Sequence, residues 1–166
     1  GNVVSEATVG IDVSHCSGVT VDISGVADTT GNGMRFVNSD TLTVTDNVVI
    51  QASSKGISFW SSDDVSAEGN TITETDGIGL YAYGGSGLSL VDNTTADNAT
   101  HGVKLTGSDT VTLSGHLSHD NGSHGVFLSS LTSATIDSDL MSCDNTWTDV
   151  LIDGVDVSSS YTATCP

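Results

Sequence analysis

The sequence has very few cations, a single proline, few aromatic side chains and no long hydrophobic run. Only 3 of its 166 residues are lysine or arginine, against 21 aspartates and glutamates, so its formal net charge is −18. Such a chain lacks the basic clusters that bind nucleic acid and is repelled by anionic lipid. Without ~18 consecutive apolar residues it is not expected to insert into a membrane. It also lacks a signal-peptide pattern, so we expect any leader to have been removed or to lie outside this sequence.

Residues that favour helices are also scarce. Of the acidic residues 18 are aspartate and 3 are glutamate, and aspartate, asparagine, glycine, serine and threonine all favour turns. A charged chain rich in glycine and serine is often disordered. Here, however, valine, isoleucine and leucine recur at regular intervals throughout. The composition therefore predicts an all-β fold with many turns.

The sequence repeats every 23 residues. One series at this spacing consists of Gly10, Gly33, Gly56, Gly79, Gly102 and Gly125. A second consists of Ser24, Asn47, Asn70, Asn93, His116 and Asp139. Between the two series, apolar residues stand two apart, as Val19 and Val21 do, which is typical of short strands with alternate side chains pointing inward.

Each repeat contains two clear strands and a weaker third. The inward positions of the third are Val26, Val49, Ile72, Thr95, Ser118 and Met141. One such unit cannot bury its inward face alone, but stacked units can, because each strand then pairs in parallel with its copy. The sequence therefore predicts a parallel β-helix, a solenoid of about seven rungs of 23 residues.

This repeat resembles the right-handed parallel β-helix of pectin-lyase-like proteins. The resemblance rests on the asparagine, the spacing and the glycine followed by alternating apolar residues, best seen from Asn70 to Leu80 and from Asn121 to Leu128. It implies one right-handed β-helix domain over residues 1–166, a segment of a larger secreted or cell-surface protein. The superfamily holds pectate lyases, polygalacturonases, alginate epimerases, phage tailspikes and non-enzymatic surface modules.

The register of the fourth rung has two solutions. The strict period selects Gly79 and points Leu80 and Ala82 inward. The alternative selects Gly77 and points Ile78 and Leu80 inward. We favour the Gly77 register, because its inward pair is larger and buries more apolar area.

The recurring asparagines predict structural ladders. Asn47, Asn70 and Asn93 fall at one corner, and Asn98 and Asn121 at another. Stacked amides can hydrogen-bond to one another and to turn backbone, and asparagine tolerates left-handed corner geometry. Asn93, Asn98 and Asn121 also lie in N-glycosylation sequons.

Two cysteines suggest a disulfide. Cys143 and Cys165 are 22 residues apart, which places them near the same corner of adjacent rungs and makes them a candidate pair closing the last turn. Cys16 would be left over. The alternative interpretation is that all three are small buried side chains.

The acidic surface has two explanations. The lack of lysine suits a halophilic protein, because high salt screens the repulsion among carboxylates. The other explanation is Ca²⁺ bound in turns, for which Asp40, Asp63 and Asp64 form the best candidate cluster. Ca²⁺ is the one cofactor that the sequence suggests.

The residues that precede the recurring glycines form the candidate functional column. In the favoured register this column is Asn32, Lys55, Asp76, His101, His124 and Thr148. Polygalacturonases of the same superfamily carry paired acids in this column, and this chain does not. A uronate lyase needs a base and a cation, and the only lysine and arginine residues of this chain are Arg35, Lys55 and Lys104. Histidines and an acid in successive rungs suit a metal or a glycan, and aromatic rings suit sugar faces. The candidate carbohydrate-binding face contains Asp76, His101, His124, Lys104, Lys55, Trp60, Tyr81 and Tyr83. The alternative interpretation is that these are ordinary surface residues.

Another outward column carries hydroxyls, namely Thr20, Thr43, Ser66, Ser89, Thr112, Thr135 and Ser158. Such an array resembles the faces of some ice-binding proteins, although threonine is also simply a good exposed strand residue.

These observations favour a non-enzymatic extracellular or cell-surface module, acting as a rigid spacer, adhesin or assembly unit with carbohydrate contacts. The first alternative is a polysaccharide-active enzyme of the pectin-lyase-like group, and the second is ice binding. The expected partners are a polysaccharide or other surface-protein subunits, with end-to-end stacking on an open N-terminal rung.

Overall fold

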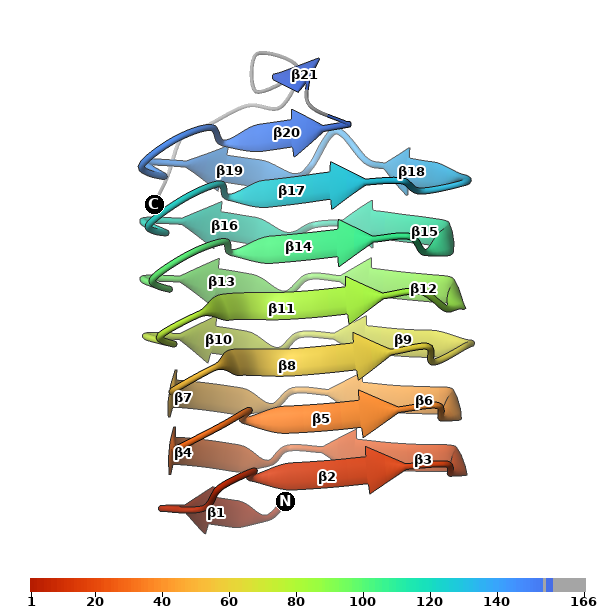
Figure 1. Ribbon diagram of the computed structural model, residues 1–166, viewed down its shortest axis with the longest axis vertical. Helices are drawn as coiled ribbons and strands as arrows, with labels where there is room; N and C mark the ends of the chain where they lie inside the picture. Colours follow the sequence, from red (N-terminus) through yellow and green to blue (C-terminus); the bar gives the residue numbers. More distant parts are fainter. Residues whose placement is uncertain (154, 157–166) are drawn as a thin grey trace.

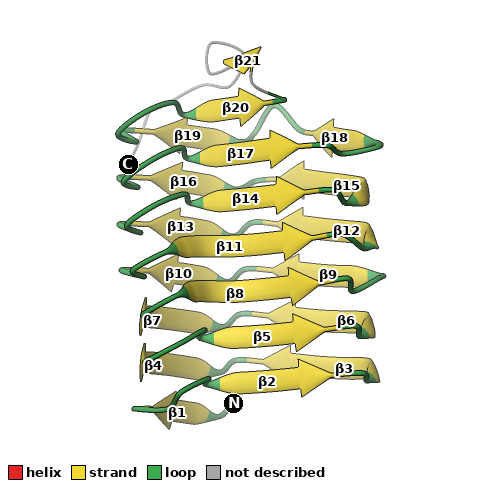
Figure 2. Ribbon diagram, viewed as in Figure 1, coloured by secondary structure: helices red, strands yellow, loops and turns green. Residues whose placement is uncertain are grey.

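The computed structural model describes residues 1–153 and 155–156, which wind into a parallel β-helix. Each of the first six turns contributes one strand to each of three sheets that run along the molecule (Figure 1), and within the described residues the seventh turn contributes to two of them. Figure 2 shows strands joined by short loops, without a helix in the described part of the chain. That part therefore also contains no helix long and apolar enough to cross a membrane.

Three sheets enclose the core. The seven-stranded sheet contains β1 (Val3–Ser5), β4 (Gly25–Thr29), β7 (Val48–Ala52), β10 (Thr71–Thr73), β13 (Thr94–Ala96), β16 (Leu117–His119) and β19 (Met141–Cys143). The eight-stranded sheet contains β2 (Ile11–Ser14), β5 (Met34–Val37), β8 (Lys55–Trp60), β11 (Ile78–Tyr83), β14 (Val103–Thr106), β17 (Val126–Ser129), β20 (Val150–Ile152) and β21 (Val155–Asp156). The six-stranded sheet contains β3 (Ser17–Asp22), β6 (Asp40–Thr45), β9 (Val65–Glu68), β12 (Ser86–Val91), β15 (Asp109–Ser114) and β18 (Ala134–Ile136).

Strand pairing follows the 23-residue repeat. Val103, for example, pairs in parallel with Val126, and among the described strands β21 alone pairs antiparallel, with β20. Alternate side chains point inward and stack on their copies, as Phe36 does on Phe59 with ring centroids 5.1 Å apart. Burying a large apolar side chain contributes roughly 1.5–3 kcal/mol. The predicted solenoid of about seven rungs is confirmed.

The Gly77 register favoured for the fourth rung is wrong. Leu80 and Ala82 point inward and are fully buried, whereas Ile78 is partly exposed. Gly79 occupies the corner, where an added Cβ would lie only 2.8 Å from a backbone carbonyl oxygen of the next rung. The close stacking of corners thus outweighs the extra apolar area that Ile78 would have buried.

The first predicted asparagine ladder is present and buried. The backbone N–H and side-chain amide of Asn47 both donate to Asn70 Oδ1, at 3.1 and 2.9 Å. Asn70 donates in the same way to Asn93, at 3.0 and 2.9 Å. Each amide also reaches back to a carbonyl of an earlier strand, as Asn70 Nδ2 does to Val44 O at 2.8 Å. The asparagines therefore satisfy polar groups inside the corner.

A second ladder joins Asn98, Asn121 and Asn145. Asn93, Asn98 and Asn121 are at most 1% exposed, so the three sequons do not offer an accessible amide in the folded chain.

The first ladder ends at His116, and the last turn contains one extra residue. Leu117 pairs with Met141, so the buried Leu140 follows His116 in the ladder position, and Asp139 is exposed instead. The same shift points Ser142 inward in place of Met141, which is 38% exposed. The expected ladder position of Asp139 and the inward position of Met141 are therefore wrong.

Acid sensitivity is expected from His116. Burial lowers the pKa of this histidine from 6.5 to about 3, and only its Nε2 has a partner, Thr95 Oγ1 at 3.1 Å. The unfolded chain binds a proton below pH 6.5 that the folded chain refuses, so stability falls as the pH drops from 6.5 towards 3. His116→Asn should remove this part of the acid sensitivity, measured by urea unfolding across that range. His119→Asn, at a partly exposed position, is the control. If it reduced the acid sensitivity as much as His116→Asn, the assignment of that sensitivity to His116 would be contradicted.

The aspartates have a backbone role. Eight of them adopt positive φ, a conformation that aspartate tolerates better than most residues: Asp28, Asp46, Asp64, Asp92, Asp97, Asp120, Asp144 and Asp153. Much of the negative charge therefore comes from the turns.

Two further predictions involve residues that are not described. Cys165, the expected partner of Cys143, and Ser158, the last residue of the hydroxyl column, lie outside the described residues. Cys16 is an exposed free thiol in the first rung.

Candidate functional site

Among the described residues, the outer face of the eight-stranded sheet and the turn beside it gather the cations and the aromatic side chains that are not in the core. All three lysine and arginine residues of the chain lie there. We call this surface the basic aromatic face; it consists of Arg35, Lys55, Trp60, Tyr81, Tyr83, His101, Lys104, His124, Phe127 and the adjoining Trp147. Strands β5, β8, β11, β14 and β17 and the adjoining turns supply these side chains.

One cluster on this face is built around Trp60. Its ring centroid lies 5.0 Å from that of Tyr81 and 5.8 Å from that of Tyr83, both in the next rung. The ammonium of Lys55 lies 5.6 Å from the Trp60 ring and 5.2 Å from the Tyr81 ring. The cation thus rests on aromatic rings, an arrangement that stabilises the charge while leaving it near the surface.

A second cluster is built around two histidines. His101 and His124 stack in parallel with centroids 5.3 Å apart and an interplanar angle of 8°. Phe127 lies 5.3 Å from His101, and Trp147, which is 71% exposed, meets His124 edge-on at 5.5 Å. The ammonium of Lys104 lies 5.1 Å from the Phe127 ring.

His101 is neutral at pH 7. Burial, helped by the positive charge of Lys104 and by His124, lowers its pKa from 6.5 to about 4. Nδ1 of His101 and Nδ1 of His124 are both buried without a hydrogen-bond partner. The stacked pair therefore presents the uncharged ring of His101, which can accept a proton, packed against the ring of His124.

The three cations differ in their partners. Arg35 forms a two-pronged ion pair with Asp12, at 2.7 and 3.0 Å. Within the described residues, neither Lys55 nor Lys104 has a carboxylate within ion-pair distance. These two ammonium groups remain available to an anionic ligand.

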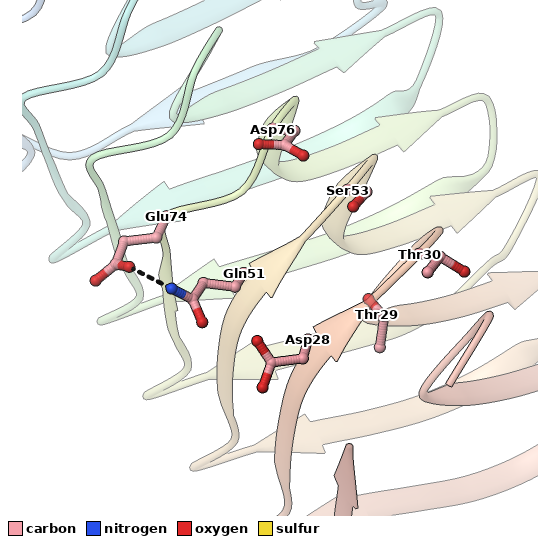
Figure 3. A pocket seen from close by; sticks show the side chains of 7 residues that line it. All are labelled: Asp28, Thr29, Thr30, Gln51, Ser53, Glu74 and Asp76. Carbon is pink, nitrogen blue, oxygen red and sulfur yellow. Dashed lines mark hydrogen bonds between the residues drawn. The ribbon is translucent and has the colours of Figure 1, made fainter. Parts of the chain in front are cut away.

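The placement of Asp76 beside the histidines is wrong. In the true register Ile78, not Asp76, pairs with Lys55, so Asp76 lies two residues earlier, on the turn after β10. Asp76 instead lines an open pocket of about 410 Å³ with Asp28 and Glu74 (Figure 3). Gln51 donates to Glu74 there at 3.1 Å. This acidic pocket would repel an anionic glycan, so we place the site on the basic aromatic face.

The metal candidates do not form a cluster. Asp63 Oδ1 accepts a hydrogen bond from Ser86 N at 2.7 Å. Asp40 and Asp64 do not join Asp63 in a set of three ligands. No set of three metal-binding side chains occurs among the described residues. The histidine–histidine–aspartate arrangement also fails, because Asp76 is elsewhere. The Ca²⁺ site stays a prediction.

The hydroxyl column lies on a different face. Thr20, Thr43, Ser66, Ser89, Thr112 and Thr135 share one outward row of the six-stranded sheet. Asp22 and Glu68 stand in the neighbouring row. Ice binding stays a prediction.

Sequence reasoning missed Phe127 and Trp147. Phe127 could have been found from the repeat, because it stands 23 residues after Lys104 at an outward position. Trp147 lies in the last turn, where the extra residue breaks the period.

Comparisons with known proteins agree with the fold. The family model described as a right handed beta helix region matches residues 1–163. A crystal structure of a double mutant of the periplasmic alginate epimerase AlgG is similar, with a TM-score of 0.83 and 19% identity, covering 89% of this chain and 36% of that one. A second AlgG structure has a TM-score of 0.56 and 17% identity, covering 90% and 39%. The chain thus spans well under half the length of these structures. None of the curated protein sequences matches it.

At these identities the solved structures establish the fold alone. The family model covers nearly the whole chain, in agreement with the three parallel sheets and the 23-residue register. The chain therefore belongs to the right-handed β-helix family.

Proposed function

We propose that the chain is a carbohydrate-binding β-helical module whose ligand is an acidic polysaccharide lying along the basic aromatic face. The observation that carries this proposal is the gathering of all three cations and five aromatic rings on one outer face of a chain with a net charge of −18.

Charge favours an anionic ligand at this face and nowhere else. Carboxylates cover the turns, so an anionic polymer is repelled from most of the surface. Lys55 and Lys104 have no carboxylate partner among the described residues, so a uronate group can pair with them without displacing an internal ion pair.

The rings supply the apolar half of the interaction. Tyr83 is 49% exposed and Trp147 is 71% exposed, which leaves ring faces open to a ligand. The C–H face of a sugar packs well on such rings, and their rigidity limits the entropy lost on binding.

The solved structures support a carbohydrate role and an extracytoplasmic location. The relative with a TM-score of 0.83 is described as a periplasmic alginate epimerase, a protein that acts on an acidic polysaccharide. We propose that this chain too works outside the cytoplasm.

Binding to soluble polyuronates tests the proposal. By affinity electrophoresis or calorimetry, the chain should bind alginate or polygalacturonate and not dextran. Each of Lys55→Gln, Lys104→Gln and Trp60→Ala should weaken binding by about five- to tenfold, because each removes an ion pair or a stacking ring. Affinity should also fall as salt rises.

Matched variants on another face provide the control. Thr43→Gln and Thr112→Ala change outward positions of the six-stranded sheet and should leave binding unchanged. Equal binding to dextran, or equal losses from these controls, would contradict a site on the basic aromatic face.

A second candidate function is proton abstraction from a bound uronate. Neutral His101 next to Lys104 favours it, because a base and a cation that neutralises the carboxylate are what such chemistry requires. Deuterium uptake at the uronate C5 from D₂O, or ultraviolet absorbance of an unsaturated product, would reveal it, and His101→Gln should abolish either signal. A module that only binds would show neither.

A further inference from the structure

The ammonium groups of Lys55 and Lys104, which have no carboxylate partner in the described part of the chain, lie above rings of a single column. Lys55 Nζ is 5.2 Å from the centroid of Tyr81, and Lys104 Nζ is 5.1 Å from the centroid of Phe127. Tyr81 and Phe127 hold the same strand position, since both pair with Lys104, one from below and the other from above. The two cations are therefore two rungs apart along the solenoid axis, a distance of about 9.6 Å.

The rung between these two cations adds no third positive charge. Its outward side chains are the stem of Lys104, Thr106 and the imidazole of His101, which is neutral at pH 7 because its pKa is about 4. In the rung of Tyr81, the position that pairs with Lys55 is the apolar Ile78. Along the axis the two lysine charges of the face are thus two rungs apart, with no charge between them, while Arg35 is neutralised by Asp12.

This period discriminates between two kinds of acidic polymer. A pyranose residue in an extended glycan is about as long as the spacing between rungs. A polymer made only of uronates would place a carboxylate at each rung, and half of them would lie against uncharged rings without a partner. A polymer in which uronate alternates with an uncharged sugar would place its carboxylates at the spacing of the two cations and its uncharged residues between them.

We propose that the basic aromatic face selects an alternating copolymer of a uronate and an uncharged sugar over a homopolymer of uronates. This inference rests on the proposed function and names the ligand class of the same site. The spacing of Lys55 and Lys104 is its structural basis.

Oligosaccharides of equal length test the selection. The probes are hyaluronan hexasaccharide, in which glucuronate alternates with N-acetylglucosamine, and hexamers of guluronate and of galacturonate. At one fixed salt concentration, calorimetry should give hyaluronan an affinity about fivefold higher, although it carries half as many carboxylates.

Shifting the charge period should reverse this preference. Ile78 pairs with Lys55, so a lysine at this position repeats Lys55 one rung further along the axis; Ile78→Lys therefore places an ammonium between those of Lys55 and Lys104, at a partly exposed position that the core does not need. The homouronates should then bind at least as tightly as hyaluronan. Thr112→Lys adds the same charge to the outer face of the six-stranded sheet, so it should leave the ratio of affinities unchanged.

The outcomes separate the two proposals. If homouronates bind the unmodified chain as tightly as hyaluronan does, or if Ile78→Lys changes the ratio no more than Thr112→Lys, the inference is overturned and the proposed function stands. If none of the acidic probes binds a chain with native circular dichroism, both are overturned.

Discussion

Val111→Asp is expected to prevent the chain from folding. Val111 lies in β15, in the middle of the stack, and is 2% exposed between Leu88 and Ala134 of the neighbouring strands. A carboxylate there has no cation to pair with and cannot reach water. The cost of burying it is of the order of 5 kcal/mol, which is comparable with the whole stability of a domain of this size. Loss of the β circular dichroism spectrum and of cooperative unfolding would be the readout.

Thr112→Asp is the matched control for this prediction. Thr112 is the next residue of the same strand and points outward, so its variant adds the same charge without burying it. It should keep the native spectrum and lose less than about 1 kcal/mol. If Val111→Asp folded as well as Thr112→Asp, the assignment of the inward face would be contradicted.

The sequence was sufficient to predict the fold because every rung repeats the same local solution. Corner glycines such as Gly56 and ladder asparagines such as Asn70 recur at the spacing that stacking imposes, and the inward side chains alternate between them. Local preference and long-range pairing therefore give the same register.

The errors occur where the repeat is irregular. At Gly79 the choice between two registers depended on how closely the corner packs against the next rung, which apolar area alone does not reveal. In the last turn a single extra residue moved Leu140 into the ladder position and exposed Asp139. A one-residue shift turns every side chain of a strand to the other face, so a strict period cannot locate such a change.

The candidate site, like the fold, could be located from the sequence where the repeat is regular. Seven of the eight residues named from the sequence share one outer face, namely Lys55, Trp60, Tyr81, Tyr83, His101, Lys104 and His124. Asp76 does not, because its placement depended on the wrong register. The cation–ring contacts of Lys55 and Lys104 depend on side-chain conformations that no spacing specifies.

Asn70→Asp is expected to cause the largest loss among changes at the corners. The amide Nδ2 of Asn70 donates to Val44 O at 2.8 Å and to Asn93 Oδ1 at 2.9 Å, and the residue is fully buried. A carboxylate oxygen in its place would face two acceptors without a proton to share. Leaving such groups unsatisfied costs about 1–3 kcal/mol each, and the buried charge adds to that, so we expect a loss of roughly 4 kcal/mol or more. Urea unfolding at pH 7 would measure it.

Asn38→Asp makes the same chemical change at an exposed turn and isolates the effect of burial. Among the described residues the Asn38 side chain has one hydrogen bond, between its Nδ2 and His15 Nε2 at 3.3 Å, so its variant should lose less than about 1 kcal/mol. The difference between the two variants should shrink as the pH falls. Burial against two acceptors raises the pKa of an aspartate at position 70 in the folded state, so the folded chain binds the proton more tightly than the unfolded one and gains stability in acid. Equal losses in the two variants at pH 7, or a difference that grows in acid, would contradict a ladder that depends on amide donors.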